Sequence, residues 1–165
     1  MRFSSLTEAD RFYLAEAFAE RLHTDDPKAK TVPQSAVGAV IANASGELAR
    51  SSNVIPPRLK AKMEGEKQAV ATEDRYHIIE HAERAALFKA YLAGENLEAA
   101  TLYCTRFPCS DCARAIAWSP IRRVVLPNGF AGEKRWLEAQ RAALRILRGS
   151  GIKVRYLPVG DQEQS

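Results

Sequence analysis

Hydrophobic residues along this chain recur with two different periods, which predicts that helices and strands alternate. Residues 4–23 place large apolar side chains at the spacing of an amphipathic helix. Residues 36–43 form a short apolar run with β-branched side chains, which predicts a buried strand. A turn at Ser45 and Gly46, followed by a second strand that reaches Asn53, completes a predicted hairpin.

The second half of the chain repeats a helix–strand pattern. We expect helices at 80–94, 109–119 and 132–151, and strands at 100–105, 122–127 and 152–158. Because strands and helices alternate, the predicted class is α/β, with a sheet flanked by helices. The long polar segment 54–79 breaks the pattern, and we expect an inserted loop with one short helix there.

Composition is that of an ordinary globular domain. The chain has 165 residues, of which 46% are apolar and 27% charged, so we expect one domain over 1–165 with a disordered tail at 160–165. No apolar run approaches the length of a membrane span, and the N-terminal residues lack the apolar stretch of a signal peptide. With only three cysteines, a secreted disulfide framework is not expected. These features predict a cytoplasmic protein without a membrane partner.

The charge pattern bears on the kind of ligand. The formal net charge is +4, which suits a phosphate-bearing ligand, but the lysines and arginines are scattered rather than clustered. A polynucleotide partner is therefore not favoured. Arg106, Arg75 and Lys60 are candidates to meet a phosphate, although a solvated surface charge is the default for each.

Two of the cysteines, Cys109 and Cys112, stand one helical turn apart behind Pro108. At this spacing both sulfurs can face one ion, and the amides of a helix N-terminus favour thiolates. A C-x-x-C pair alone also fits a redox motif, half of a four-cysteine zinc knot, or a chance pair in the core. The second cysteine pair that a zinc knot requires is missing from the sequence.

His81 and Glu83 lie near the start of the preceding predicted helix, and a predicted strand separates that helix from Cys109. In a helix–strand–helix unit both helices can begin near one another, so that His81, Cys109 and Cys112 can meet. One imidazole and two thiolates supply three zinc ligands and leave a fourth position for water, which is the pattern of a catalytic site. Zinc lowers the pKa of its water to about 7, and Glu83 is placed to move the proton.

The sequence H-A-E at 81–83, followed by P-C-x-x-C at 108–112, is the signature of zinc-dependent deaminases. With these motifs the chain resembles the cytidine deaminase superfamily, and most closely its deoxycytidylate (dCMP) deaminase branch. Tyr76 ahead of the histidine, Phe107 instead of a glutamate before the Pro-Cys pair, and the long insert are similar to that branch. The resemblance extends over about residues 8–158.

The resemblance implies a three-layer α/β/α cytidine deaminase-like fold with a mixed five-stranded sheet whose last two strands are parallel. It implies hydrolytic deamination of an amino-substituted ring, with release of ammonia. One Zn²⁺ per chain is implied, and its ligands would be His81, Cys109 and Cys112. Glu83 would carry protons. Residues implied at the substrate are Asn53, Ala82, Phe107 and Pro108.

Two departures from the family pattern concern the substrate. Ala85 stands where the branch usually has an asparagine, and S-S-N-V at 51–54 stands where it often has Gly-Tyr-Asn-Gly. The predicted function is deamination of a free nucleotide of dCMP type. Open alternatives are deamination of another amino-bearing ring (guanine or its nucleotide, or cytidine) and a catalytically inactive relative that binds or senses nucleotides.

Remaining residues have simpler interpretations. The family favours homo-oligomers, dimers or hexamers, and exposed apolar helix faces would suit such contacts. Cys104 is expected in the core, and Trp118 and Trp136 in packing or subunit contacts. On a continuous helix His77 would share a face with His81, but an exposed loop histidine is the simpler interpretation.

Overall fold

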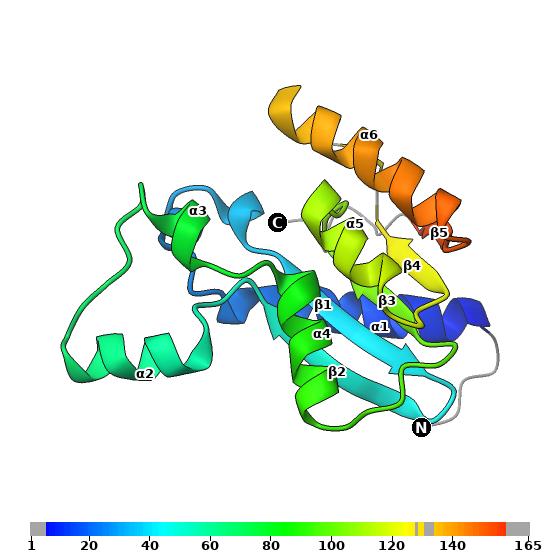
Figure 1. The fold of residues 1–165 in the computed structure, drawn as a ribbon, viewed down its shortest axis with the longest axis horizontal. Coiled ribbons are helices and arrows are strands. Elements are labelled where there is room, and N and C mark those ends of the chain that lie inside the picture. The colour runs from blue at the N-terminus through cyan, green and yellow to red at the C-terminus, as the bar shows by residue number, and fades with distance from the viewer. Residues whose placement is uncertain (1–5, 128, 131–133, 158–165) are drawn as a thin grey trace.

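The computed structural model describes residues 6–127, 129–130 and 134–157 (Figure 1). The helices are α1 (Leu6–Glu20), α2 (Pro57–Gly65), α3 (Arg75–Ile78), α4 (Ala82–Leu92), α5 (Ser110–Ala117) and α6 (Lys134–Gly149). The strands are β1 (Gly38–Asn43), β2 (Gly46–Ser52), β3 (Thr101–Cys104), β4 (Arg123–Leu126) and β5 (Lys153–Tyr156). The tail predicted at 160–165 lies outside the described residues. Within them, no helix combines the length and apolar character needed to cross a membrane.

The strands form one mixed five-stranded sheet in the order β2-β1-β3-β4-β5. Strand β1 is antiparallel to both β2 and β3, whereas β3, β4 and β5 run parallel to one another. The parallel pairs require crossover connections, and α5 and α6 supply them. The predicted α/β class, with its mixed sheet and parallel last strands, is confirmed.

Helices cover both faces of the sheet. One buried cluster joins the sheet to α4, α5 and α6, and a second joins the opposite face to α1 (Figure 1). Helix α1 approaches β1 so closely that a Cβ on Gly38 would lie 1.9 Å from the carbonyl oxygen of Ala17. Only glycine fits this contact, since backbone atoms cannot yield as a flexible side chain can.

The insert between β2 and α4 contains two short helices, α2 and α3, where the sequence predicted one. It projects from the edge of the sheet and is tied back to the loop after α1 (Figure 1). Lys60 Nζ lies 2.7 Å from the Asp25 carboxylate, and Arg75 Nη2 lies 2.6 Å from that of Asp26. These ion pairs hold the insert beside the main domain, which hydrophobic periodicity could not predict.

A buried charge anchors α1 to the parallel strands. Asp10 is fully buried, and its carboxylate accepts hydrogen bonds from Tyr103 at 3.1 Å and from Arg123 at 2.8 Å. Arg155 lies 3.3 Å from the same carboxylate. The cluster therefore connects one helix with β3, β4 and β5 across the sheet.

Replacing Asp10 with asparagine should lower the free energy of unfolding by about 2–3 kcal/mol, because two arginines lose their charged partner in a largely buried setting. Urea denaturation followed by circular dichroism measures the change. Asp111→Asn is the matched control, since this exposed carboxylate pairs with Arg114 alone among the described residues and its loss should cost at most about 0.5 kcal/mol. Equal effects of the two substitutions would contradict the anchoring role of Asp10.

Candidate metal centre and active site

Three potential metal ligands converge at the ends of two helices. The Sγ atoms of Cys109 and Cys112 lie 3.5 and 3.3 Å from His81 Nδ1, and 3.6 Å from each other. These atoms form a group that could hold a metal ion. The convergence predicted from the sequence is therefore present in the fold.

Helix starts place these side chains. His81 is the N-cap of α4 and Cys109 is the N-cap of α5, both with extended backbone, and Cys112 follows in the first turn of α5. The sequence predicted helix from residue 80, but the backbone turns helical only after His81 because Glu80 pairs with Val54 and its side chain accepts a hydrogen bond from the His81 amide. This extended entry brings the imidazole beside the start of α5.

The geometry of the three donors suits zinc. Tetrahedral zinc binds sulfur at about 2.3 Å and nitrogen at about 2.0–2.1 Å, which separates ligand atoms by about 3.5–3.8 Å. The observed separations of 3.3–3.6 Å are close to these values. One imidazole with two sulfurs also matches the soft and borderline donors that zinc prefers over magnesium or calcium.

Electrostatic coupling within the group prepares it for a cation. The hydrogen bond with Cys112 lowers the pKa of Cys109 to about 4. Cys109 forms hydrogen bonds with both His81 and Cys112. The first raises the pKa of His81 to about 9, and the second raises the pKa of Cys112. Binding of a metal ion would release the protons that His81 and Cys112 hold, because ligands bind metals in their deprotonated forms.

Glu83 stands beside the ligands without joining them. It lies in the first turn of α4, is 3% exposed, and lines the same cavity as His81 and Cys109. Burial raises the pKa of its carboxyl group. A buried carboxyl next to a metal centre is suited to accept a proton and return it.

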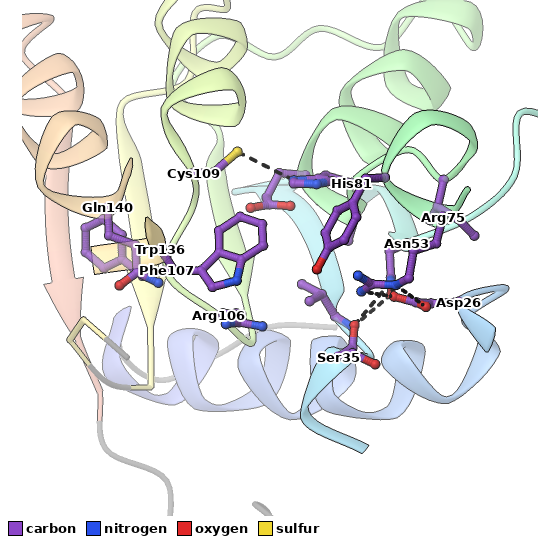
Figure 2. A pocket seen from close by; sticks show the side chains of 15 residues that line it. Asp26, Ser35, Asn53, Arg75, His81, Arg106, Phe107, Cys109, Trp136 and Gln140 are labelled. Carbon is purple, nitrogen blue, oxygen red and sulfur yellow. Dashed lines mark hydrogen bonds and ion pairs between the residues drawn. The ribbon is translucent and has the colours of Figure 1, made fainter. Parts of the chain in front are cut away.

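A cavity of about 80 Å³ adjoins these groups (Figure 2). Its walls come from the loop after α1, the end of β2, the insert, the loop after β3, and α6. The lining residues are Asp26, Ser35, Val37, Asn53, Arg75, Tyr76, Ile79, His81, Ala82, Glu83, Arg106, Phe107, Cys109, Trp136 and Gln140. Segments distant in sequence thus enclose one concave site.

Asn53 lines the cavity with its amide fully engaged by the protein. Its Oδ1 accepts from Thr24 Oγ1 at 2.8 Å and from the Val37 amide at 2.9 Å. Its Nδ2 donates to the Ser35 carbonyl at 3.1 Å and to Asp26 Oδ2 at 3.3 Å. The side chain therefore joins the end of the hairpin to the loop after α1, and a ligand would have to displace one of these partners.

Of the other residues expected at the substrate, two line the cavity and one is buried outside its lining. Ala82 and Phe107 line the cavity, and Phe107 packs edge-on against Phe130 with ring centroids 4.8 Å apart. Pro108 is buried and is not among the lining residues. Ala85, which stands where the family has an asparagine, is also buried and does not line the cavity.

Sequence patterns missed part of the cavity wall. Trp136, expected in packing or subunit contacts, lines the cavity, with the Tyr76 ring 6.5 Å away, centroid to centroid, and the Arg106 guanidinium 5.5 Å from its ring. Arg75 lines the side of the cavity opposite Trp136 (Figure 2). Tyr76, five residues ahead of His81, was a usable sequence signal for the site. Nothing in the sequence indicated that it would lie near Trp136 on α6.

Three further expectations have clear outcomes. Cys104 is fully buried in the core, as predicted. His77 is exposed, and α3 ends at Ile78 with an extended residue after it, so no continuous helix aligns His77 with His81. Lys60 pairs with Asp25 outside the cavity lining, which leaves Arg75 and Arg106 as the lining arginines.

The mixed sheet and the donor group place this protein in the class of α/β proteins with a group of three side chains that could hold a metal ion. The family model described as the zinc-binding region of cytidine and deoxycytidylate deaminases matches residues 13–127. The chain belongs to the cytidine and deoxycytidylate deaminase family.

Relatives within the family include two phage enzymes. The deoxycytidylate deaminase of Mycobacterium phage D29 is 33% identical over 129 residues, which cover 72% of this chain and 94% of that protein. The deoxycytidylate deaminase of Enterobacteria phage T2 is 38% identical over 78 residues, covering 47% of this chain and 38% of that protein. The match thus spans well under half of the T2 enzyme.

Among solved structures, the dCMP deaminase of cyanophage S-TIM5 in apo form superposes with a TM-score of 0.64. The two chains are 22% identical, and the match covers 91% of this chain and 98% of that one. The same phage enzyme in complex with dCMP and dUMP also gives a TM-score of 0.64 at 21% identity. These matches confirm the cytidine deaminase-like fold.

Proposed function

We propose that this protein is a zinc-dependent hydrolytic deaminase of a free nucleotide of dCMP type. The observation that carries the proposal is the convergence of His81, Cys109 and Cys112 beside the buried Glu83, at the base of a cavity. A structural zinc site has four protein ligands and no need for an additional carboxyl group. Three ligands with a neighbouring carboxyl suit a reaction that consumes water.

In the reaction, water replaces the amino group on a C=N carbon of the ring, so that N=C–NH₂ and water become HN–C=O and ammonia. A zinc ion held by His81, Cys109 and Cys112 would supply a water molecule whose pKa falls to about 7. The Glu83 carboxylate would take one proton from the attacking water and deliver it to the ring nitrogen. It would then take the proton of the added hydroxyl group and deliver it to the leaving amine as the ring carbonyl forms. The Ala82 and Phe107 side chains exclude bulk water from the ring.

The choice of substrate class is supported by the relatives. The D29 and T2 phage proteins are named deoxycytidylate deaminases, and the S-TIM5 enzyme binds dCMP and dUMP. A cavity with aromatic side chains at Tyr76, Phe107 and Trp136 suits a flat ring.

An ammonia-release screen tests the proposal. The zinc-loaded protein is incubated with base, nucleoside and monophosphate forms of cytosine, guanine and adenine. We expect dCMP to be converted to dUMP fastest. Faster ammonia release from a guanine compound would contradict dCMP as the substrate but support hydrolytic deamination as the reaction. No release from any compound would favour a nucleotide-binding relative without turnover.

The proposed setting is a homo-oligomer in the cytoplasm. Three large apolar side chains on α4, Phe88, Tyr91 and Leu92, are each at least half exposed, and Leu92 reaches 89%. Such a surface suits contact with a second copy. Sedimentation equilibrium of the wild type and of Leu92→Glu would show whether this face is used.

A further inference from the structure

The two arginines that line the cavity, Arg75 and Arg106, differ in whether a carboxylate neutralises their charge. Arg75 is committed to Asp26 by two hydrogen bonds, from Nε at 2.9 Å and from Nη2 at 2.6 Å. Both side chains are nearly buried, with 11% and 3% exposure, so their charges largely cancel within the wall. Arg75 thus contributes little net charge to a ligand in the cavity.

Arg106 differs from Arg75 in this respect. Among the residues that the structure describes, no carboxylate lies within ion-pair distance of its guanidinium. Its Cζ atom instead lies 5.5 Å from the centroid of the Trp136 ring, which also lines the cavity. Cation–π contact of this kind orients a guanidinium without neutralising it. Arg106 is therefore an oriented, half-buried cation with hydrogen-bond donors available.

Arg106 also lies at a useful distance from the reacting end. It belongs to the short connection between β3 and α5, and Cys109 closes that connection at the start of α5. Figure 2 shows Arg106 on the side of the cavity away from the Cys109 sulfur. A nucleotide whose ring reaches Glu83 would direct its sugar and phosphate away from the metal ligands, toward that side.

We propose that Arg106, held against Trp136, recognises the phosphate of a nucleoside monophosphate and makes the site selective for nucleotides over nucleosides and free bases. This inference rests on the proposed deaminase function and adds the group that selects the substrate class. A guanidinium presents paired N–H donors that match two phosphate oxygens, which an ammonium cannot do.

The test compares binding of dCMP and deoxycytidine by calorimetry, with the zinc-loaded Glu83→Gln protein as a background that does not consume the ligand. In this background we expect dCMP to bind at least about 10-fold more tightly than deoxycytidine. Adding Arg106→Leu should weaken dCMP binding by about 10- to 100-fold and remove most of that preference. Adding Arg106→Lys should restore part of the preference, since the charge returns without the paired donors.

Arg122→Leu is the matched control, because Arg122 is 62% exposed and pairs only weakly with Glu98 at 3.6 Å. It should keep the dCMP preference. In the Glu83→Gln background, the preference for dCMP should also fall as the salt concentration rises, because salt screens the attraction between Arg106 and the phosphate. The fall should be smaller in the protein that also carries Arg106→Leu, because that charge is absent.

The inference is overturned if the Glu83→Gln protein shows no preference for dCMP, or if Arg106→Leu lowers the affinity for both ligands equally. Ammonia release by the wild type separates this failure from that of the proposed function. Equal ammonia release from deoxycytidine and dCMP would support the proposed deaminase activity and contradict the proposed phosphate selectivity. Absence of ammonia release would contradict the proposed deaminase activity. The ratio of the affinities for dCMP and deoxycytidine would still test the role of Arg106.

Discussion

Glu83→Gln should reduce ammonia release by about 10²- to 10⁴-fold while leaving the zinc content at about one ion per chain. The amide keeps the size of the carboxyl group but cannot accept the proton that water must lose. The three ligand side chains are unchanged, so the metal should remain. Steady-state turnover of dCMP and elemental analysis of the same sample measure both quantities.

Glu98→Gln is the control for this substitution. Glu98 is 61% exposed and lies outside the cavity lining, so turnover should match that of the wild type. Near-normal turnover of Glu83→Gln would exclude Glu83 as the proton carrier. Loss of zinc along with activity would show instead that the carboxyl group supports the metal site.

Cys112→Ser should remove nearly all bound zinc after dialysis against a chelator, and turnover should disappear with it. The sulfur is fully buried and lies 3.3 Å from His81 Nδ1, so no solvent ligand can easily replace it. A serine hydroxyl is a poor zinc ligand because it stays protonated near neutral pH, unlike a thiolate beside a metal. Elemental analysis and thermal unfolding report on the metal and on the junction of α4 with α5.

Cys104→Ala is the matched control among the cysteines. Cys104 is equally buried but belongs to the hydrophobic core on β3 and is not a member of the ligand group. Its replacement should leave the zinc content unchanged and cost only the packing of one sulfur. Retention of zinc by Cys112→Ser at the level of Cys104→Ala would contradict the assigned ligand set.

Local spacing explains why the candidate metal ligands could be found in the sequence. Cys109 and Cys112 share one helical turn, and His81 and Glu83 share the start of another, so each pair is placed by its own helix. A single strand between the helices then limits where their N-termini can lie. Few alternative arrangements of these elements were possible.

The cavity walls could not be found in this way. Asp26 and Arg75 come from an irregular loop and an insert, and their ion pair depends on neither hydrophobic period. Trp136 reaches the cavity because of how α6 crosses the sheet. Even Asn53, expected at the substrate, is held by four protein groups that its sequence position does not reveal.

The sequence by itself determined the main alternation of helices and strands, the α/β class and the residues able to bind a metal, because periodicity and spacing within a turn are local properties. The mixed sheet was implied by the family resemblance, and the second helix of the insert was not predicted. Only the tertiary structure decided that Arg75 is neutralised by Asp26 whereas Arg106 is oriented by Trp136. Charge balance depends on which side chains meet in space, and packing between distant segments sets those meetings.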